Sequence, residues 1–151
     1  MKPTPEIIEL ARKLYDAGHR QEIQEGDWVK CDVYKGIHLV CSAYREWVVL
    51  NELGHVFEKD CIPIPDLSTC LRWLKGKTDF RVELWGHQRR ETWICRWEGG
   101  LGGATKWKEA PTPEEACMKA MLKILEGEAD QQRKDDEWEA IRPDPQEEGD
   151  K

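Results

Sequence analysis

The sequence predicts an α+β protein in which an N-terminal helix and a small antiparallel sheet precede an α-β-β-β-α two-layer subdomain and a charged C-terminal tail. Apolar residues recur at helical spacing behind threonine caps, and elsewhere they alternate with polar residues over short runs bounded by glycine. Eight tryptophans among 151 residues supply enough apolar area for a packed interior. We expect three parts, at residues 1–61, 62–127 and 128–151.

The first part opens with a helix. Thr4-Pro5-Glu6 combines a threonine cap with a proline in the first turn, and Gly18 ends the helix. The inward side is expected to carry Ile7, Leu10, Ala11 and Leu14. Four strand-like runs follow, at residues 27–33, 37–43, 47–50 and 55–57. Their tight turns indicate a small curled sheet or partial barrel, with the first helix covering one opening.

The second part begins at Ile62-Pro63-Ile64-Pro65, where two prolines exclude an interior strand because each removes a ladder donor. We interpret this stretch as the junction between the halves. A cap at Asp66 or Ser68 opens a short helix. Strands are expected at residues 80–85, 92–98 and 104–108. Thr112-Pro113-Glu114-Glu115 then opens a helix so apolar that it must pack on this sheet.

Charge is unevenly distributed along the chain. The total is −7, whereas residues 66–125 carry 11 basic and 8 acidic side chains, a net +3. Residues 126–151 carry 11 acidic and 4 basic side chains, a net −7. The acidity is therefore a property of the tail, which argues against a folded body that mimics DNA. We expect a marginal helix at residues 128–141 and disorder at residues 142–151.

Three features of the second part occur together: Pro65-Asp66-Leu67 before a short helix, a tryptophan-rich hairpin, and Thr112-Pro113-Glu114-Glu115-Ala116 followed by Lys119-Ala120-Met121-Leu122. Over roughly the C-terminal half, this pattern resembles the phage ABA sandwich domain of small phage and prophage proteins. That family offers no established activity. The resemblance therefore implies a phage or prophage accessory protein of unknown role.

The α-β-β-β-α order is also similar to that of the double-stranded RNA-binding domain, and Gly86-His87-Gln88-Arg89 resembles its Gly-Pro-x-His-like loop without the proline. Members of that family place lysines at the start of the last helix, where this chain has Glu114 and Glu115. Carboxylates there satisfy the helix dipole and repel phosphate, which argues against binding double-stranded RNA by the usual route. Glu25-Gly26-Asp27-Trp28-Val29 resembles the opening of small SH3-like barrels, so we expect an SH3-like N-terminal sheet.

Strand alternation divides the second sheet into two faces. The inner face, toward the helices, is expected to carry Phe80, Val82, Leu84, Trp93, Cys95 and Trp97. The outer face is expected to carry Arg81, Glu83, Trp85, Ile94 and Arg96. The candidate partner-binding residues are Arg81, Trp85, His87, Arg89, Arg90, Arg96 and Lys106. Two alternatives stay open: the N-terminal sheet covers the outer face, or this face is an ordinary solvated surface.

A mixed patch of tryptophan, isoleucine and arginine suits a partner protein or unpaired nucleic acid. We expect a non-enzymatic protein-interaction module that binds an unidentified host or phage protein. Binding of single-stranded nucleic acid is the alternative, and an enzyme of unidentified class comes third. The tail is either a solvated extension or an arm that docks on a basic partner surface with Trp138 as its anchor. The oligomeric state stays open.

The sequence lacks the spacing of metal, phosphate or catalytic sites. Structural zinc sites need close thiolate or imidazole pairs, and the nearest mixed pair, His38 and Cys41, would sit on opposite faces of a strand. The glycine cluster at residues 99–103 precedes a strand, which favours a hairpin loop over a phosphate loop. No nucleophile, base and orienting group stand out together. We expect no catalytic residue, no metal and no cofactor.

The sequence also bears on the compartment. No apolar run approaches the ~18–20 residues of a membrane span, and the N-terminus is typical of a polar helix rather than a signal peptide. We expect a cytoplasmic protein, in the host cytoplasm if it is phage-encoded, that has no membrane partner. The six cysteines are then interpreted as reduced, buried groups rather than disulfides.

Overall fold

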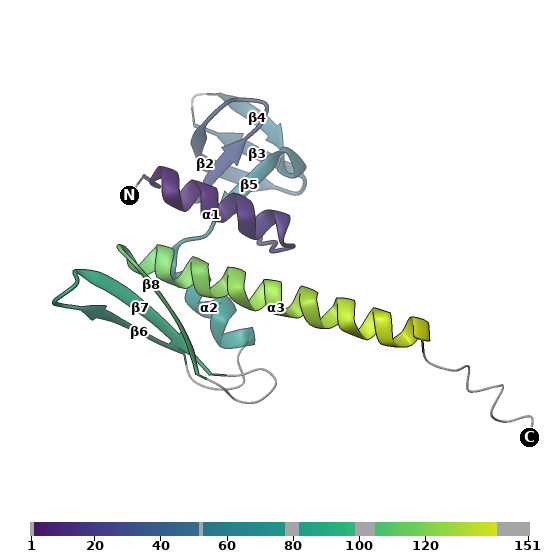
Figure 1. The fold of residues 1–151 in the computed structure, drawn as a ribbon. Coiled ribbons are helices and arrows are strands. Elements are labelled where there is room, and N and C mark those ends of the chain that lie inside the picture. Colours follow the sequence, from purple (N-terminus) through teal and green to yellow (C-terminus); the bar gives the residue numbers. More distant parts are fainter. Residues whose placement is uncertain (1, 52, 78–81, 99–104, 142–151) are drawn as a thin grey trace, which may run out of the picture.

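The computed structural model describes residues 2–51, 53–77, 82–98 and 105–141, and these parts form helices and two antiparallel sheets (Figure 1). This confirms the predicted α+β class. The helices are α1 (Pro5–Asp16), α2 (Leu67–Lys77), α3 (Pro113–Ile141) and a short 3₁₀ helix, η1 (Glu58–Asp60). The first sheet contains β1 (Trp28–Cys31), β2 (Ile37–Tyr44), β3 (Trp47–Leu50), β4 (Gly54–Phe57) and β5 (Cys61–Ile64). The second contains β6 (Val82–His87), β7 (Thr92–Trp97) and β8 (Lys106–Ala110).

Three sequence predictions lie outside the described residues. They concern Phe80 and Arg81 at the start of the hairpin, the glycine cluster at residues 99–103, and the expected disorder of residues 142–151.

Helix α1 is capped as the sequence predicts. The Thr4 hydroxyl accepts a hydrogen bond from the Ile7 N–H at 3.3 Å. After the helix, Gly18 has a φ of 102°, a left-handed conformation that favours glycine. The His19 N–H then donates to the Leu14 carbonyl at 2.9 Å. These bonds satisfy backbone groups that the helix itself leaves unpaired.

The first sheet has the strand order β4-β3-β2-β1-β5. The chain meanders from β1 to β4, passes through η1, and returns with β5 beside β1. This connectivity is typical of small SH3-like barrels. A separate cluster of buried residues fills the inside of the sheet, with Val29, Val40, Val48, Leu50 and Val56 among its members.

The stretch interpreted as a junction forms strand β5, and the expected boundary between residues 61 and 62 falls inside it. Pro63 fits because β5 lies at the sheet edge. The Cys31 N–H donates to the Gly36 carbonyl, which lies on the β2 side of β1. Backbone groups two residues apart point the same way, so those of Val29 also point toward β2 and not toward β5. Pro63, which lies opposite Val29, is therefore at a position without hydrogen bonds to β1. The missing N–H of Pro63 therefore lies on the side away from β1, and the prediction that the prolines exclude an interior strand is confirmed.

The second sheet has the order β6-β7-β8, and α2 and α3 both lie against one of its faces (Figure 1). The core between them contains Leu74 of α2, Cys95 and Trp97 of β7, and Met118 and Met121 of α3. The predicted packing of the capped apolar helix on the tryptophan-rich hairpin is therefore confirmed.

Helix α1 belongs to this second core. Its buried residues Ile7, Leu10, Ala11 and Leu14 share one cluster with the core residues of α3, and α1 runs beside α3 in Figure 1. Helix α1 also contacts β5, and Ile64 of β5 belongs to the same cluster, so α1 lies against the first sheet, as expected, and packs on α3 in addition. The physical reason is that α3 is apolar on several sides, so it needs cover from α1 as well as from the sheet.

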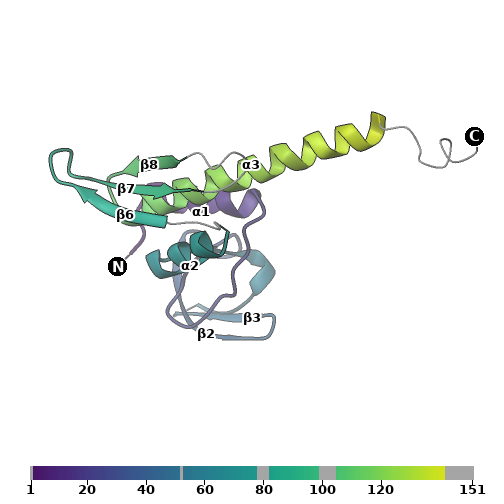
Figure 2. The ribbon, with the colours of Figure 1, turned by 90° about the horizontal axis from the view of Figure 1, so that it is seen from below.

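Helix α3 is longer than expected, because it continues through Gly127 to Ile141. Its last part, residues 126–141, is exposed throughout and projects from the body as an arm (Figures 1 and 2). Lys77 forms an ion pair with Glu128 at 3.1 Å where the arm leaves the body. The expected helix at residues 128–141 is thus confirmed, whereas the expected boundary at residue 127 lies inside α3.

Candidate functional site

The register of the second sheet defines its outer face. Trp85 pairs with Ile94 across β6 and β7, and Arg96 pairs with Glu83 on one side and Trp107 on the other. Paired residues lie directly opposite each other on the same face, so these side chains form neighbouring rows. They surround a shallow depression of about 380 Å³ whose lining includes Trp85, His87, Arg90, Ile94, Arg96 and Trp107.

No described element covers this face. Helices α2 and α3 lie against the other side of the sheet, and the first sheet lies beyond α1 (Figure 1). Trp85 and Trp107 are 38% and 57% exposed. The structure therefore places Trp85 and Arg96 on the predicted face, and the alternative that the N-terminal sheet covers this face is wrong.

Two assignments of the sequence analysis need correction. Lys106 pairs with Trp97, which is buried in the core, so alternation places Lys106 on the opposite side of the sheet from Arg96. Its neighbour Trp107 belongs to the outer face instead. Trp93 is on the inner side as expected, but it is 38% exposed because it lies near the end of the sheet, opposite Gly86.

The cations of the outer face are paired with carboxylates. Arg90 Nη1 lies 3.2 Å from Glu109 Oε2, and Arg96 Nη2 lies 3.4 Å from Glu98 Oε1. The Thr92 hydroxyl also donates to Glu109, and this bond together with Arg90 lowers the pKa of the Glu109 carboxyl. The face thus presents exposed indole rings between fixed charges of both signs.

The remaining candidate residues are spread over three places. Arg81 lies outside the described residues. Arg89 lies in the exposed turn between β6 and β7, where the His87 Nδ1 accepts a hydrogen bond from the Arg90 N–H at 3.3 Å. Trp138 is 61% exposed on the projecting arm, far along α3 from the sheet (Figure 1). The tail anchor and the outer face are therefore separate features.

An aromatic patch on the first sheet was not predicted. Trp47 and Phe57 are paired across β3 and β4, and their rings stack with centroids 4.2 Å apart. His55 and Tyr44 flank them on the same outward side. The signal was present in the alternation of β3, where Val48 and Leu50 are buried while Trp47 faces outward.

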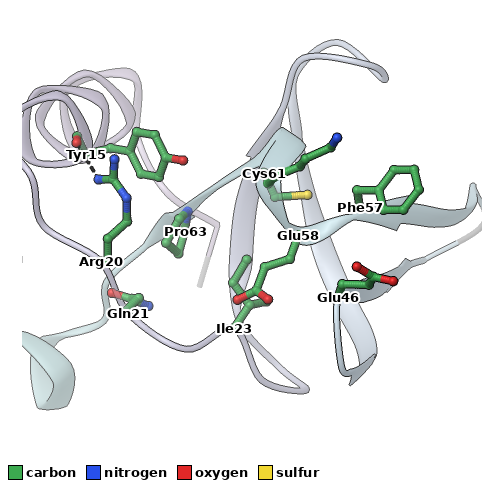
Figure 3. Close-up of a pocket in the computed structure, with 10 residues that line it drawn as sticks. Tyr15, Arg20, Gln21, Ile23, Glu46, Phe57, Glu58, Cys61 and Pro63 are labelled. Carbon is green, nitrogen blue, oxygen red and sulfur yellow. Dashed lines mark hydrogen bonds between the residues drawn. The ribbon is translucent and has the colours of Figure 1, made fainter.

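A pocket of about 390 Å³ lies where the segment after α1 meets β4, η1 and β5 (Figure 3). Arg20 and Tyr15 line one side, whereas Glu46 and Glu58 line the other. Ile23, Cys61 and Pro63 contribute buried apolar groups between these sides. Sequence analysis missed this pocket, because its residues come from distant parts of the chain.

The cysteines are free thiols, as expected, and all but Cys41 are buried. Burial is the largest cause that raises the pKa of the Cys61 thiol to about 12, and the neighbouring Cys31 adds to the effect. A thiol with such a pKa stays protonated and is a poor nucleophile near neutral pH.

Within the described residues, no group of three or more histidine, cysteine, aspartate or glutamate side chains is arranged to hold a metal ion. Among the described helices, none combines the length and the apolar composition needed to cross a membrane.

Comparison of the chain with protein-family models, with curated proteins and with solved structures finds no match in any of the three.

Proposed function

We propose that this chain is a non-enzymatic protein-interaction module that binds a partner protein through the outer face of β6, β7 and β8. The observation that carries the proposal is the uncovered cluster of Trp85, Ile94 and Trp107, in two neighbouring rows of the face, with Arg90 and Arg96 around the same depression. Tryptophan and arginine are enriched among the residues that dominate protein–protein binding energy. The resemblance of residues 62–125 to the phage ABA sandwich domain supports a role as a phage accessory protein in the host cytoplasm.

The charge arrangement favours a protein over a nucleic acid as the partner. Glu83, Glu98 and Glu109 share the face with its arginines; Glu109 forms an ion pair with Arg90, and Glu98 forms one with Arg96. A nucleic-acid site gains most of its affinity from cations that neutralise phosphates, so carboxylates beside each cation oppose it. A protein surface of mixed charge complements such a pattern.

Binding of single-stranded nucleic acid is the second candidate, and the exposure of two indole rings on one sheet favours it. Trp85 and Trp107 offer platforms on which unpaired bases stack. Titration with a fluorescein-labelled deoxythymidine oligonucleotide separates the two proposals. A saturable anisotropy change that weakens with salt and disappears in a Trp85→Ala/Trp107→Ala variant would favour nucleic acid.

A crosslinking experiment tests the protein-binding proposal. A photoreactive phenylalanine analogue replaces Trp107 in the full chain, and host lysate is irradiated. The matched control carries the analogue at Trp47, an exposed tryptophan of the first sheet. We expect a distinct crosslinked product from position 107 that excess wild-type protein suppresses and that an added Trp85→Ala/Arg96→Ala change weakens at least tenfold, as loss of central contacts does. The same product from both positions, or no loss in the variant, would refute the proposal.

A further inference from the structure

The pocket between α1 and the first sheet contains an arginine whose position is fixed by the protein (Figure 3). Arg20 Nη1 donates to the Tyr15 carbonyl at 2.6 Å and to the His19 carbonyl at 2.9 Å. The guanidinium also lies over the Tyr15 ring, 3.7 Å from its centroid. These contacts complete the C-terminal end of α1 and hold the side chain in one orientation, so a ligand would not have to order it.

The same contacts leave part of the guanidinium available. The carbonyls of Tyr15 and His19 both accept their hydrogen bonds from Nη1. The Nε and Nη2 groups of Arg20 make no hydrogen bond to any described residue. Figure 3 shows this second edge of the guanidinium turned toward Pro63 and the pocket. Two parallel N–H donors on one edge match the two oxygens of a carboxylate.

The opposite side of the pocket is acidic. Glu46 and Glu58 are held together because the Glu58 N–H donates to the Glu46 carbonyl at 2.8 Å. Lys59 also lines this side, but its ammonium group lies over the Phe57 ring, and neither carboxylate forms an ion pair with a described cation, so two carboxylates face one ammonium group. This side therefore favours a ligand group that is positively charged.

Apolar groups lie between the two charged sides. Ile23 is 5% exposed, Cys61 is 2% exposed, and Pro63 is buried. Pro63 has no N–H, and the Cys61 N–H is bonded to the Glu58 carbonyl, so this edge of β5 offers no backbone donor for an added strand. The pocket thus suits a small ligand better than a strand from another protein.

From this arrangement we infer that the pocket binds a short zwitterionic peptide with an apolar side chain. Its carboxylate bonds the free edge of Arg20, its ammonium group faces Glu46 and Glu58, and its side chain packs on Ile23 and Pro63. The volume of about 390 Å³ is that of a small-molecule site. Because Pro63 separates the charged sides, the ligand charges must also be separated, and an extended dipeptide separates them by about 7 Å.

The probe for the experiment is leucyl-leucine, with N-acetyl-leucyl-leucine and leucyl-leucine amide as matched ligands that lack one charge each. Binding to the full ¹⁵N-labelled chain is followed by amide chemical shifts. We expect saturable shifts of pocket amides with leucyl-leucine. Each capped ligand should bind about ten- to a hundredfold more weakly, the usual cost of losing a charged hydrogen bond.

Two protein variants address the two sides of the pocket separately. Glu58→Gln keeps the side-chain size but removes the negative charge, and Arg20→Gln removes the guanidinium. Each variant should lower the affinity for leucyl-leucine at least tenfold. Arg89→Gln, in the distant turn between β6 and β7, is the matched control and should bind as the wild type does. Arg20 also bonds the carbonyls at the C-terminal end of α1, so Arg20→Gln can lower the affinity by disturbing this helix end. Glu58→Gln does not change the helix end and therefore tests the ligand contact alone.

The inference is overturned if leucyl-leucine causes no saturable shift up to about 10 mM. It is equally overturned if the capped ligands bind the wild-type protein as tightly as leucyl-leucine does, or if the Glu58→Gln variant binds leucyl-leucine as tightly as the wild type does. The site lies on the first sheet and none of its residues belongs to the outer face, so neither outcome depends on the proposed partner binding.

Discussion

Replacing Leu14 by alanine tests whether α1 is part of the core built around α3. Leu14 is fully buried in the cluster that also contains Cys95, Trp97 and Met118. Truncation removes apolar contact and leaves a cavity, and such a change costs about 2.7–5 kcal/mol in the free energy of unfolding. For a chain of 151 residues the midpoint of thermal unfolding should fall by roughly 6–20 °C. Lys13→Ala is the matched control, because Lys13 lies on the same helix and is exposed.

Urea unfolding measures the loss in stability, and hydrogen exchange shows where the loss is felt. We expect the slope of the urea transition to stay unchanged, and the amides of α3 to lose protection together with those of α1. If Leu14→Ala costs less than about 1 kcal/mol, the burial argument fails. If protection falls in β1 to β5 but not in α3, α1 belongs to the first sheet and the core described above is wrong.

Three further predictions follow from single features. Gly127→Ala should raise the free energy of unfolding by about 0.5–1 kcal/mol in urea unfolding, because Gly127 lies inside α3 with open space around it; a loss would contradict a continuous helix. Burial lowers the pKa of His19 below its ordinary 6.5, so the unfolded chain takes up a proton that the folded chain resists. Stability should therefore decrease as the pH falls below 6.5, and a slope that persists in His19→Gln would refute this cause. Deleting residues 130–151 should change the free energy of unfolding by less than about 1 kcal/mol, because residues 130–141 are exposed throughout and the Lys77–Glu128 ion pair is kept. If Trp138 anchors the arm on a basic partner, the deletion should weaken capture most at low salt, whereas equal capture by both forms would remove that role.

Local signals in the sequence were sufficient for the elements. The caps at Thr4 and Thr112 and the left-handed Gly18 are used as predicted, because capping depends only on neighbouring backbone groups. Alternation within the hairpin also placed Trp85 and Arg96 on the outer face, since the side-chain period of a strand is two residues.

What the sequence could not supply were the relations between distant elements. The side on which Lys106 and Trp107 lie depends on the register of β8 against β7, and that register is set by which residues reach the core. The position of α1 depends on apolar surfaces of both β5 and α3, which are far apart in the sequence. The pocket joins Arg20 to Glu58, which are brought together only when β5 returns beside β1.

The core also explains why so many large aromatic side chains remain on the surface. Of the eight tryptophans, all of which are described, only Trp97 is buried. Trp28 and Trp73 are partly buried and pack against the core, so the tryptophans supply part of the interior but not most of it. The buried residues around α3 are mostly small or flexible, among them Ala11, Cys70, Cys95, Ala110, Ala116, Cys117, Met118, Ala120 and Met121.

Small side chains allow helices and strands to approach closely, and methionine fills the irregular gaps that remain. Because α3 receives neighbours from α1, α2 and the second sheet, large rings would hold these elements apart. The interior is thus complete without the rings of Trp85 and Trp107. Both rings keep apolar surface in contact with water, so the free energy that burial of this surface would contribute is not gained in the isolated chain. A partner that covers the outer face would recover this free energy, which is the physical basis for proposing that the face is a binding surface.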